Sequence, residues 1–161
     1  MDADPFVAAV GFVFEHSPWI AREAWQQRPF ESVAALHGAM TAVVDRAPAE
    51  RQIALIAAHP DLAGRVAREG RLTAASTQEQ RSAGLDRLTP DEINRFETLN
   101  DAYRKRFGFP FVICARENTK ESILAALDAR VRNDPRAEVR TALSEIAKIA
   151  RLRLTEAVND R

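Results

Sequence analysis

The chain has 161 residues, 46% hydrophobic and 29% charged, which is the composition of one ordinary soluble globular domain. Its 23 basic and 23 acidic residues give no net charge and are interleaved, so they build no basic face for nucleic acid. No run approaches the roughly 20 apolar residues of a membrane helix, and the single cysteine, Cys114, allows no intrachain disulfide. We therefore predict a single cytoplasmic domain over residues 1–161, with neither a membrane nor a nucleic acid as partner.

Helix-start signals recur along the whole chain. An N-cap residue followed by a first-turn proline stands at Asp4-Pro5, Ser17-Pro18, Thr89-Pro90 and Asp134-Pro135. Further helices are predicted over residues 32–44, 49–58, 76–83 and 121–132. The helix after Thr89 should end at Gly108, Asp61 should cap a short helix, and the segment after Asp134 forms one long helix or two. The sequence therefore predicts an all-α protein, a single compact domain of about eight helices.

The run from Phe109 to Ile113 is the one strand-like segment. It has no second alternating segment to pair with, so we predict an extended connector rather than part of a sheet. An extended connector has backbone N–H and C=O groups that no helix uses, so it can bind a ligand through its main chain.

His59 follows the apolar run 53–58 and precedes Pro60. The proline disfavours helical dihedrals at His59, so the ring should leave the axis of the preceding helix. Neighbouring groups can move the pKa of an imidazole across neutrality, which suits proton transfer. The alternative is a helix-end residue bonded to a carbonyl.

Ser76 and Glu79 are spaced i, i+3. With His59, and without a cluster of metal-type cysteines and histidines, they suggest proton-transfer chemistry on a small polar molecule. The same spacing is that of a capping box, in which Ser76 begins the helix and Glu79 reaches back to it. Spacing alone favours the capping box.

Arg153 lies on the edge of an apolar stripe in the last predicted helix, whereas Arg140, Lys148 and Arg151 turn away from it. A guanidinium that faces the core needs an anionic partner. A bound anion and a buried glutamate are equally good candidates on spacing alone. We expect His37 to pack against another helix, His16 to be structural and Cys114 to be a packed thiol.

Five segments resemble those of the OHCU decarboxylases, which convert 2-oxo-4-hydroxy-4-carboxy-5-ureidoimidazoline (OHCU) to (S)-allantoin. They are FEHSPWIA at 14–21, HPDLAG at 59–64, STQEQRSAGL at 76–85, FGFPFVI at 107–113 and EIAKIARLRL at 145–154. The segments cover nearly the whole chain in the expected order. The resemblance implies a carboxy-lyase of urate catabolism that needs no cofactor or metal, and a homodimer.

The resemblance also implies roles for individual residues. His59 would handle the proton and Glu79 would be its companion carboxylate, while Pro60 shapes the wall of the pocket. The other substrate-binding residues would be Ser76, Thr77, Gln78, Gln80 and Arg153, with Phe111, Val112, Ile113, Cys114 and Ala115 holding the ureido arm through the backbone. Two alternatives remain: a helical interaction module without catalysis, and a decarboxylase of a related ureido or hydantoin acid.

Overall fold

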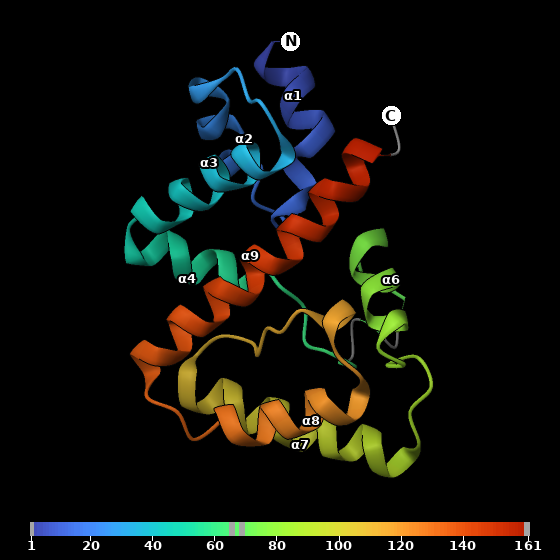
Figure 1. Cartoon of the computed structure of the whole chain (residues 1–161). Helices are drawn as coiled ribbons and strands as arrows, with labels where there is room; N and C mark the ends of the chain where they lie inside the picture. The colour runs from blue at the N-terminus through green and yellow to red at the C-terminus, as the bar shows by residue number, and fades with distance from the viewer. Residues whose placement is uncertain (1, 65–66, 68–69, 160–161) are drawn as a thin grey trace. The chain divides into compact units, whose positions relative to one another are not determined.

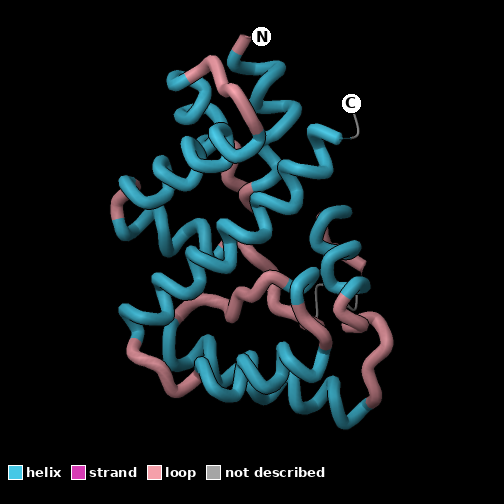
Figure 2. Tube along the Cα trace, in the orientation of Figure 1, coloured by secondary structure: helices cyan, strands magenta, loops and turns pink. Residues whose placement is uncertain are grey.

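The computed structural model describes residues 2–64, 67 and 70–159, and these form eight α-helices with no strand (Figure 2). The α-helices are α1 (Ala3–Val10), α2 (Trp19–Ala24), α3 (Val33–Arg46), α4 (Ala49–Ala57), α6 (Ala74–Ser82), α7 (Pro90–Phe107), α8 (Lys120–Arg130) and α9 (Pro135–Asn159). Short 3-10 turns are η1 (Gly11–Val13), η2 (Trp25–Gln27) and η3 (Ala115–Glu117). The all-α prediction is confirmed, and the segment after Asp134 is one helix.

Several helix boundaries follow from local chemistry. Thr89 caps α7 in a full capping box with Glu92, because its hydroxyl accepts from the Glu92 N–H while the Glu92 carboxylate accepts from the Thr89 N–H. Gly108 ends the same helix with a φ of 78°, a left-handed conformation that glycine adopts at no steric cost. Ser32 caps α3 through a bond from the Ala35 N–H. These boundaries were predicted within a few residues.

Two of the predicted caps are wrong. Asp4 lies inside α1, whose N-cap is Asp2, so the proline at position 5 occupies a later position of the first turn. The hydroxyl of Ser17 donates to the Glu15 carbonyl, and Pro18 is the N-cap of α2. In both places a cap-plus-proline pair marked the correct turn, but its polar side chain does not cap the helix.

The chain divides into two compact units, which are described separately. Unit 1 comprises Met1–Ala58 and Ile146–Arg161, and in it α2 packs against both α1 and α3 (Figure 1). Ile20, Ala24 and Met40 are completely buried there. The His37 ring lies 2.7 Å from the Ala147 carbonyl oxygen, so the prediction that His37 packs against another helix is confirmed.

Unit 2 comprises His59–Glu145, and its helices α7 and α8 lie side by side (Figure 1). Phe96, Ile123 and Leu127 are completely buried in its core. Burying one such side chain contributes about 1.5–3 kcal/mol to the free energy of unfolding. The unit boundary after Glu145 falls within α9.

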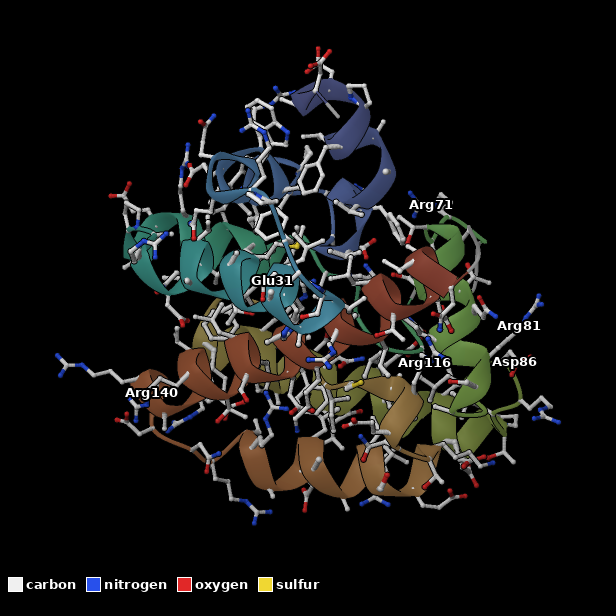
Figure 3. The ribbon with its side chains drawn as sticks, turned by 45° about the horizontal axis from the view of Figure 1, so that its top comes forward. Glu31, Arg71, Arg81, Asp86, Arg116 and Arg140 are labelled. Atoms are coloured by element: carbon white, nitrogen blue, oxygen red, sulfur yellow. The ribbon has the colours of Figure 1, made fainter. Side chains whose placement is uncertain are left out.

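Charged side chains are mostly at the surface, as their interleaving in the sequence predicted. Figure 3 labels six exposed examples, which are Glu31, Arg71, Arg81, Asp86, Arg116 and Arg140. Among the described helices, none is both long and apolar enough to cross a membrane. The polar residues that are buried therefore stand out, and five of the predicted site residues are among them: His59, Ser76, Glu79, Gln80 and Arg153.

Candidate active site

The segment that carries His59 is a buried turn whose backbone forms hydrogen bonds with side chains of α6 and α7. Helix α4 ends at Ala57, so His59 lies two residues beyond it, and its residue surface is only 6% exposed. The Gln80 side-chain carbonyl accepts from the Ala63 N–H at 3.0 Å, and the Asn100 amide donates to the Leu62 carbonyl at 3.0 Å. The expected end of the helix before His59 is confirmed.

Backbone geometry explains why this turn needs its particular residues. Ala63 has a φ of 54°, which is uncommon outside glycine and persists where surrounding contacts enforce it. A Cβ added at Gly64 would lie 2.7 Å from the Asp61 Cβ, so only glycine fits there without a shift. Asp61 forms an ion pair with Arg104 at 3.2 Å. The short helix that we expected Asp61 to cap falls largely on residues 65, 66, 68 and 69, which lie outside the described residues.

Helix α6 begins earlier than predicted, and this removes the capping-box interpretation of Ser76 and Glu79. Its N-cap is Thr73, whose hydroxyl accepts from the Ser76 N–H at 3.2 Å. Ser76 is thus the third residue of the helix, and its own N–H is already bonded. The side chains of Ser76, Glu79 and Gln80 are buried on one face of α6 at i, i+3, i+4 spacing.

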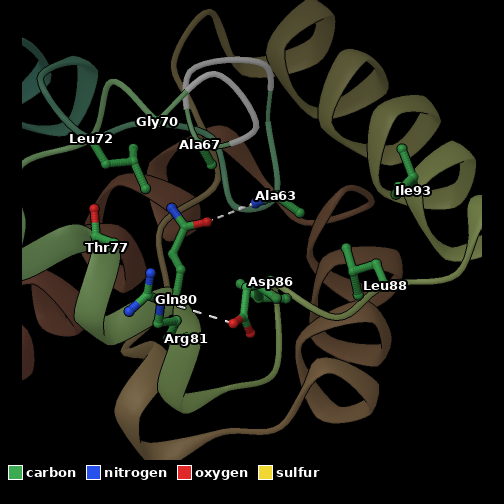
Figure 4. A pocket seen from close by; sticks show the side chains of 11 residues that line it. Ala63, Ala67, Gly70, Leu72, Thr77, Gln80, Arg81, Asp86, Leu88 and Ile93 are labelled. Carbon is green, nitrogen blue, oxygen red and sulfur yellow. Dashed lines mark hydrogen bonds and ion pairs between the residues drawn. The ribbon is translucent and has the colours of Figure 1, made fainter.

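The remaining predicted residues of α6 lie elsewhere on the helix. Gln78 is exposed. Thr77 and Gln80 line a cavity of about 580 Å³ together with residues of the segments before and after α6 and with Ile93 of α7. Neither Ser76 nor Glu79 is among its lining (Figure 4). At the edge of this cavity Arg81 lies 3.9 Å from Asp86 (Figure 4). The structure therefore gathers Ser76, Glu79 and Gln80 on one buried face and leaves Gln78 outside it.

The predicted connector lies between α7 and η3 and contains no regular secondary structure from residue 110 to residue 114. All five residues from Phe111 to Ala115 are buried. The Val112 carbonyl accepts from Arg130 at 2.8 Å, and the Cys114 N–H donates to the Glu145 carboxylate at 3.1 Å. Neither the N–H nor the C=O of Ile113 makes a hydrogen bond within the described residues. A buried backbone with unused donors and acceptors is suited to hold a polar ligand.

Electrostatics connect α6 with this connector. Burial raises the pKa of the Cys114 thiol to about 11, and the negative charges of Glu117, Glu145 and Glu79 add to the rise. Helix α6 also contacts η3 directly. Cys114 is buried, as expected of a packed thiol, and the raised pKa keeps the thiol protonated near neutral pH.

Arg153 is buried in unit 1, where its guanidinium lies 2.7 Å from the Glu15 carboxylate. It also donates to the Phe12 carbonyl at 3.3 Å. The buried glutamate that the spacing argument left open is therefore present, and Arg140, Lys148 and Arg151 are exposed as predicted.

Sequence analysis missed three buried polar residues that shape this region, namely Asn100, Arg130 and Glu145. One signal was available for Glu145, because Ala142, Ile146 and Ile149 place it on the buried face of α9. The same signal was available for the other two residues, because Phe96 and Tyr103 place Asn100, and Ile123 and Leu127 place Arg130, on the buried faces of their helices. Among the described residues, no group of three or more histidine, cysteine, aspartate or glutamate side chains is arranged to hold a metal ion.

Known proteins share this sequence and fold. The family model described as OHCU decarboxylase matches residues 1–155. The chain is 46% identical to a 2-oxo-4-hydroxy-4-carboxy-5-ureidoimidazoline decarboxylase of Haloferax volcanii, covering 97% of this chain and 90% of that protein. It is 43% identical to the protein of that name in Mus musculus, covering 97% and 88% of the two chains. It is also 38% identical to the uric acid degradation bifunctional protein PucL of Bacillus subtilis, covering all of this chain and 32% of that protein.

Solved structures agree. A crystal structure of (S)-allantoin synthase superposes with a TM-score of 0.78 at 31% identity, and this chain spans about half of that one, 51%. A crystal structure of OHCU decarboxylase in the presence of (S)-allantoin has the same fold, with a TM-score of 0.73 over 95% of this chain and 96% of that one, at 22% identity. The helical fold, the family model and the named relatives together identify an all-α decarboxylase. The chain belongs to the OHCU decarboxylase family.

Proposed function

We propose that this chain decarboxylates OHCU to (S)-allantoin in the degradation of urate. The observation that carries the proposal is the burial of Ser76, Glu79 and Gln80 on one face of α6, next to a buried connector with unused backbone groups. Full-length relatives that bear the name of this activity support it.

The substrate itself provides the electron sink for this reaction. When the bond from C4 to the carboxylate breaks and CO2 leaves, the electron pair stays at C4 and the adjacent C5=N bond accepts it. The nitrogen of that bond takes up a proton, the C4 hydroxyl loses its proton as it becomes a carbonyl, and C5 receives a proton from one face. Overall the anion loses CO2 and takes up one proton, so the protein must handle a proton, place charge and hold the ring rigidly.

In this proposal His59 delivers the proton that sets the S configuration. Glu79 orients the ring through its N–H groups, favours a protonated His59 and disfavours the substrate carboxylate, which promotes its loss. The burial of both residues supports these roles, because charges act more strongly away from water.

Substrate binding is proposed for the remaining predicted residues. Ser76 and Gln80 would donate or accept neutral hydrogen bonds, Pro60 would form part of the wall, and residues 111–115 would hold the ureido arm through the backbone. Because Gln78 is exposed, we expect it to contribute less to substrate binding than Ser76 and Gln80 do. Arg153 would pair with the anionic substrate, a role that stays a prediction beside its observed pairing with Glu15.

We also propose that residues 1–161 act as one functional domain in a cytoplasmic homodimer. Light scattering of the purified protein measures this directly: a mass of one chain, 17.9 kDa, contradicts the dimer, and twice that mass supports it.

The decisive experiment supplies urate, urate oxidase and the hydrolase of the preceding step, and follows allantoin by circular dichroism. With the protein present we expect rapid formation of (S)-allantoin. A slow racemic signal that the protein does not change would instead support a module without catalysis. Turnover of a related ureido or hydantoin acid, with none of OHCU, would support the other alternative.

A further inference from the structure

The connector is fixed from behind by a buried guanidinium. The Arg130 Nη1 donates to the Val112 carbonyl at 2.8 Å, and the guanidinium lies 4.3 Å from the centre of the Phe111 ring. Arg130 is itself 9% exposed. A planar, stacked guanidinium can hold an aromatic ring and a carbonyl at the same time, which the flexible ammonium of a lysine cannot do.

A buried network fixes Arg130 in turn. Its Nε lies 2.7 Å from the Glu138 carboxylate, which is completely buried. The same carboxylate accepts from the Tyr103 hydroxyl at 2.6 Å and from the Asn133 amide at 3.0 Å. Burial, with the hydrogen bond to Glu138, raises the pKa of Tyr103 well above its usual value, so the hydroxyl remains a donor. Three side chains, from α7, α9 and the loop before α9, therefore determine where the guanidinium lies.

Peptide geometry carries this constraint to Ile113. The Val112 carbonyl and the Ile113 N–H belong to one planar trans peptide unit and point in opposite directions. Arg130 holds the carbonyl, so it also sets the direction of the Ile113 N–H. Glu145 acts in the same way one unit later, because its bond to the Cys114 N–H sets the direction of the Ile113 C=O. Neither group of Ile113 has a hydrogen-bond partner within the described residues.

We propose that Arg130 and Glu145 are positioning residues that aim the N–H and C=O of Ile113 at the substrate. A neighbouring donor and acceptor match a urea-type group, which offers both a carbonyl and N–H groups, so Ile113 selects the ureido arm. This inference rests on the proposed function for the identity of the ligand. The constraint on the backbone does not depend on that function.

The test compares Arg130→Lys with Arg132→Lys, an exposed arginine just beyond the end of α8. For Arg130→Lys we expect KM for OHCU to rise about tenfold, as for the loss of one charge-assisted hydrogen bond. The kcat should change by less than about threefold, because His59 and Glu79 are untouched. For Arg130→Lys, the rate of amide hydrogen exchange over residues 111–115 should rise by about tenfold in the free protein. Arg132→Lys should leave KM, kcat and this exchange rate unchanged.

Glu145→Gln and Glu145→Ala refine the result. Glutamine still offers an oxygen to the Cys114 N–H, so KM should rise less for Glu145→Gln than for Glu145→Ala. Equal effects of the two variants would contradict the role given to Glu145. If Arg130→Lys does not fold, Tyr103→Phe takes its place, with a smaller rise in connector exchange of about twofold to threefold.

An Arg130→Lys protein that loses stability but keeps the wild-type KM and connector exchange overturns the proposal. If the wild-type protein itself fails to turn over OHCU, the proposed function is lost, while the exchange measurement still decides whether Arg130 orients the connector. The two failures are therefore distinguishable.

Discussion

The turn at residues 59–64 and the connector at residues 109–115 are both irregular and largely buried, yet they use their backbone groups in opposite ways. In the turn, side chains from α6 and α7 occupy the Ala63 N–H and the Leu62 carbonyl. In the connector, the side chains are locked in the core and both backbone groups of Ile113 are left without a bond in the described chain. The turn therefore fixes the position of the His59 side chain, whereas the connector fixes the orientation of the backbone groups of Ile113.

This difference predicts that, within unit 2, one segment serves catalysis and the other serves substrate binding. Changes at the turn and at Glu79 should act mainly on kcat, because they disturb the proton-handling groups. Changes that loosen the connector should act mainly on KM, because they disturb binding. The substitutions that follow test this division, from the largest expected effect to the smallest.

His59→Asn should have the largest effect. Asparagine keeps a hydrogen-bond donor and suits a helix end, so the fold and product binding should persist. The kcat should fall by about 10²–10⁴-fold, the usual value of a positioned acid or base. Circular dichroism of the product should then show largely racemic allantoin from the spontaneous reaction. Formation of (S)-allantoin at close to the normal rate would rule out the role given to His59.

Glu79→Gln keeps the shape of the side chain and removes its charge. The kcat should fall by about 10²-fold, the low end for a positioned acid–base group. Because Thr73 caps α6, thermal unfolding should change little. The exposed Glu31→Gln variant makes the same chemical change as a control. A variant with wild-type kcat and a lowered melting temperature would assign Glu79 to structure instead.

Asn100→Leu removes the bond to the Leu62 carbonyl and leaves that buried acceptor unpaired. The free energy of unfolding should fall by about 1–3 kcal/mol, measured by urea denaturation. Because the turn carries His59, kcat should also fall while KM changes little. Asn94→Leu on the exposed side of the same helix is the matched control. A rise in KM with unchanged kcat would contradict the assignment of the turn to catalysis.

Arg153→Lys keeps the positive charge but removes the planar guanidinium, whose Nη1 contacts both Glu15 and Phe12. We expect KM to rise about tenfold, with the enantiomeric excess of the product nearly unchanged. Arg151→Lys, exposed on the same helix, should behave like the wild type. If stability falls and KM does not change, the pair with Glu15 is the whole role of Arg153.

The sequence alone determined the features that depend on neighbouring residues. The capping box at Thr89, the left-handed glycine at position 108 and the end of α4 before Pro60 all rest on contacts a few residues apart. The apolar periodicity of α9 likewise placed Arg153 on its buried side and Arg151 outside. Local propensity and periodicity are sufficient there, because the deciding interactions lie within one or two turns.

Only the tertiary structure decided which polar groups are paired. The spacing of Ser76 and Glu79 favoured Ser76 as the N-cap of α6, whereas in the folded chain Thr73 is the cap. The partners of Arg130, Glu145 and Arg153 lie far away in sequence, so no local pattern identifies them. A buried charge must find a partner somewhere, but which partner it finds depends on how the helices pack. The same packing leaves both backbone groups of Ile113 without a hydrogen bond to any residue that the structure describes.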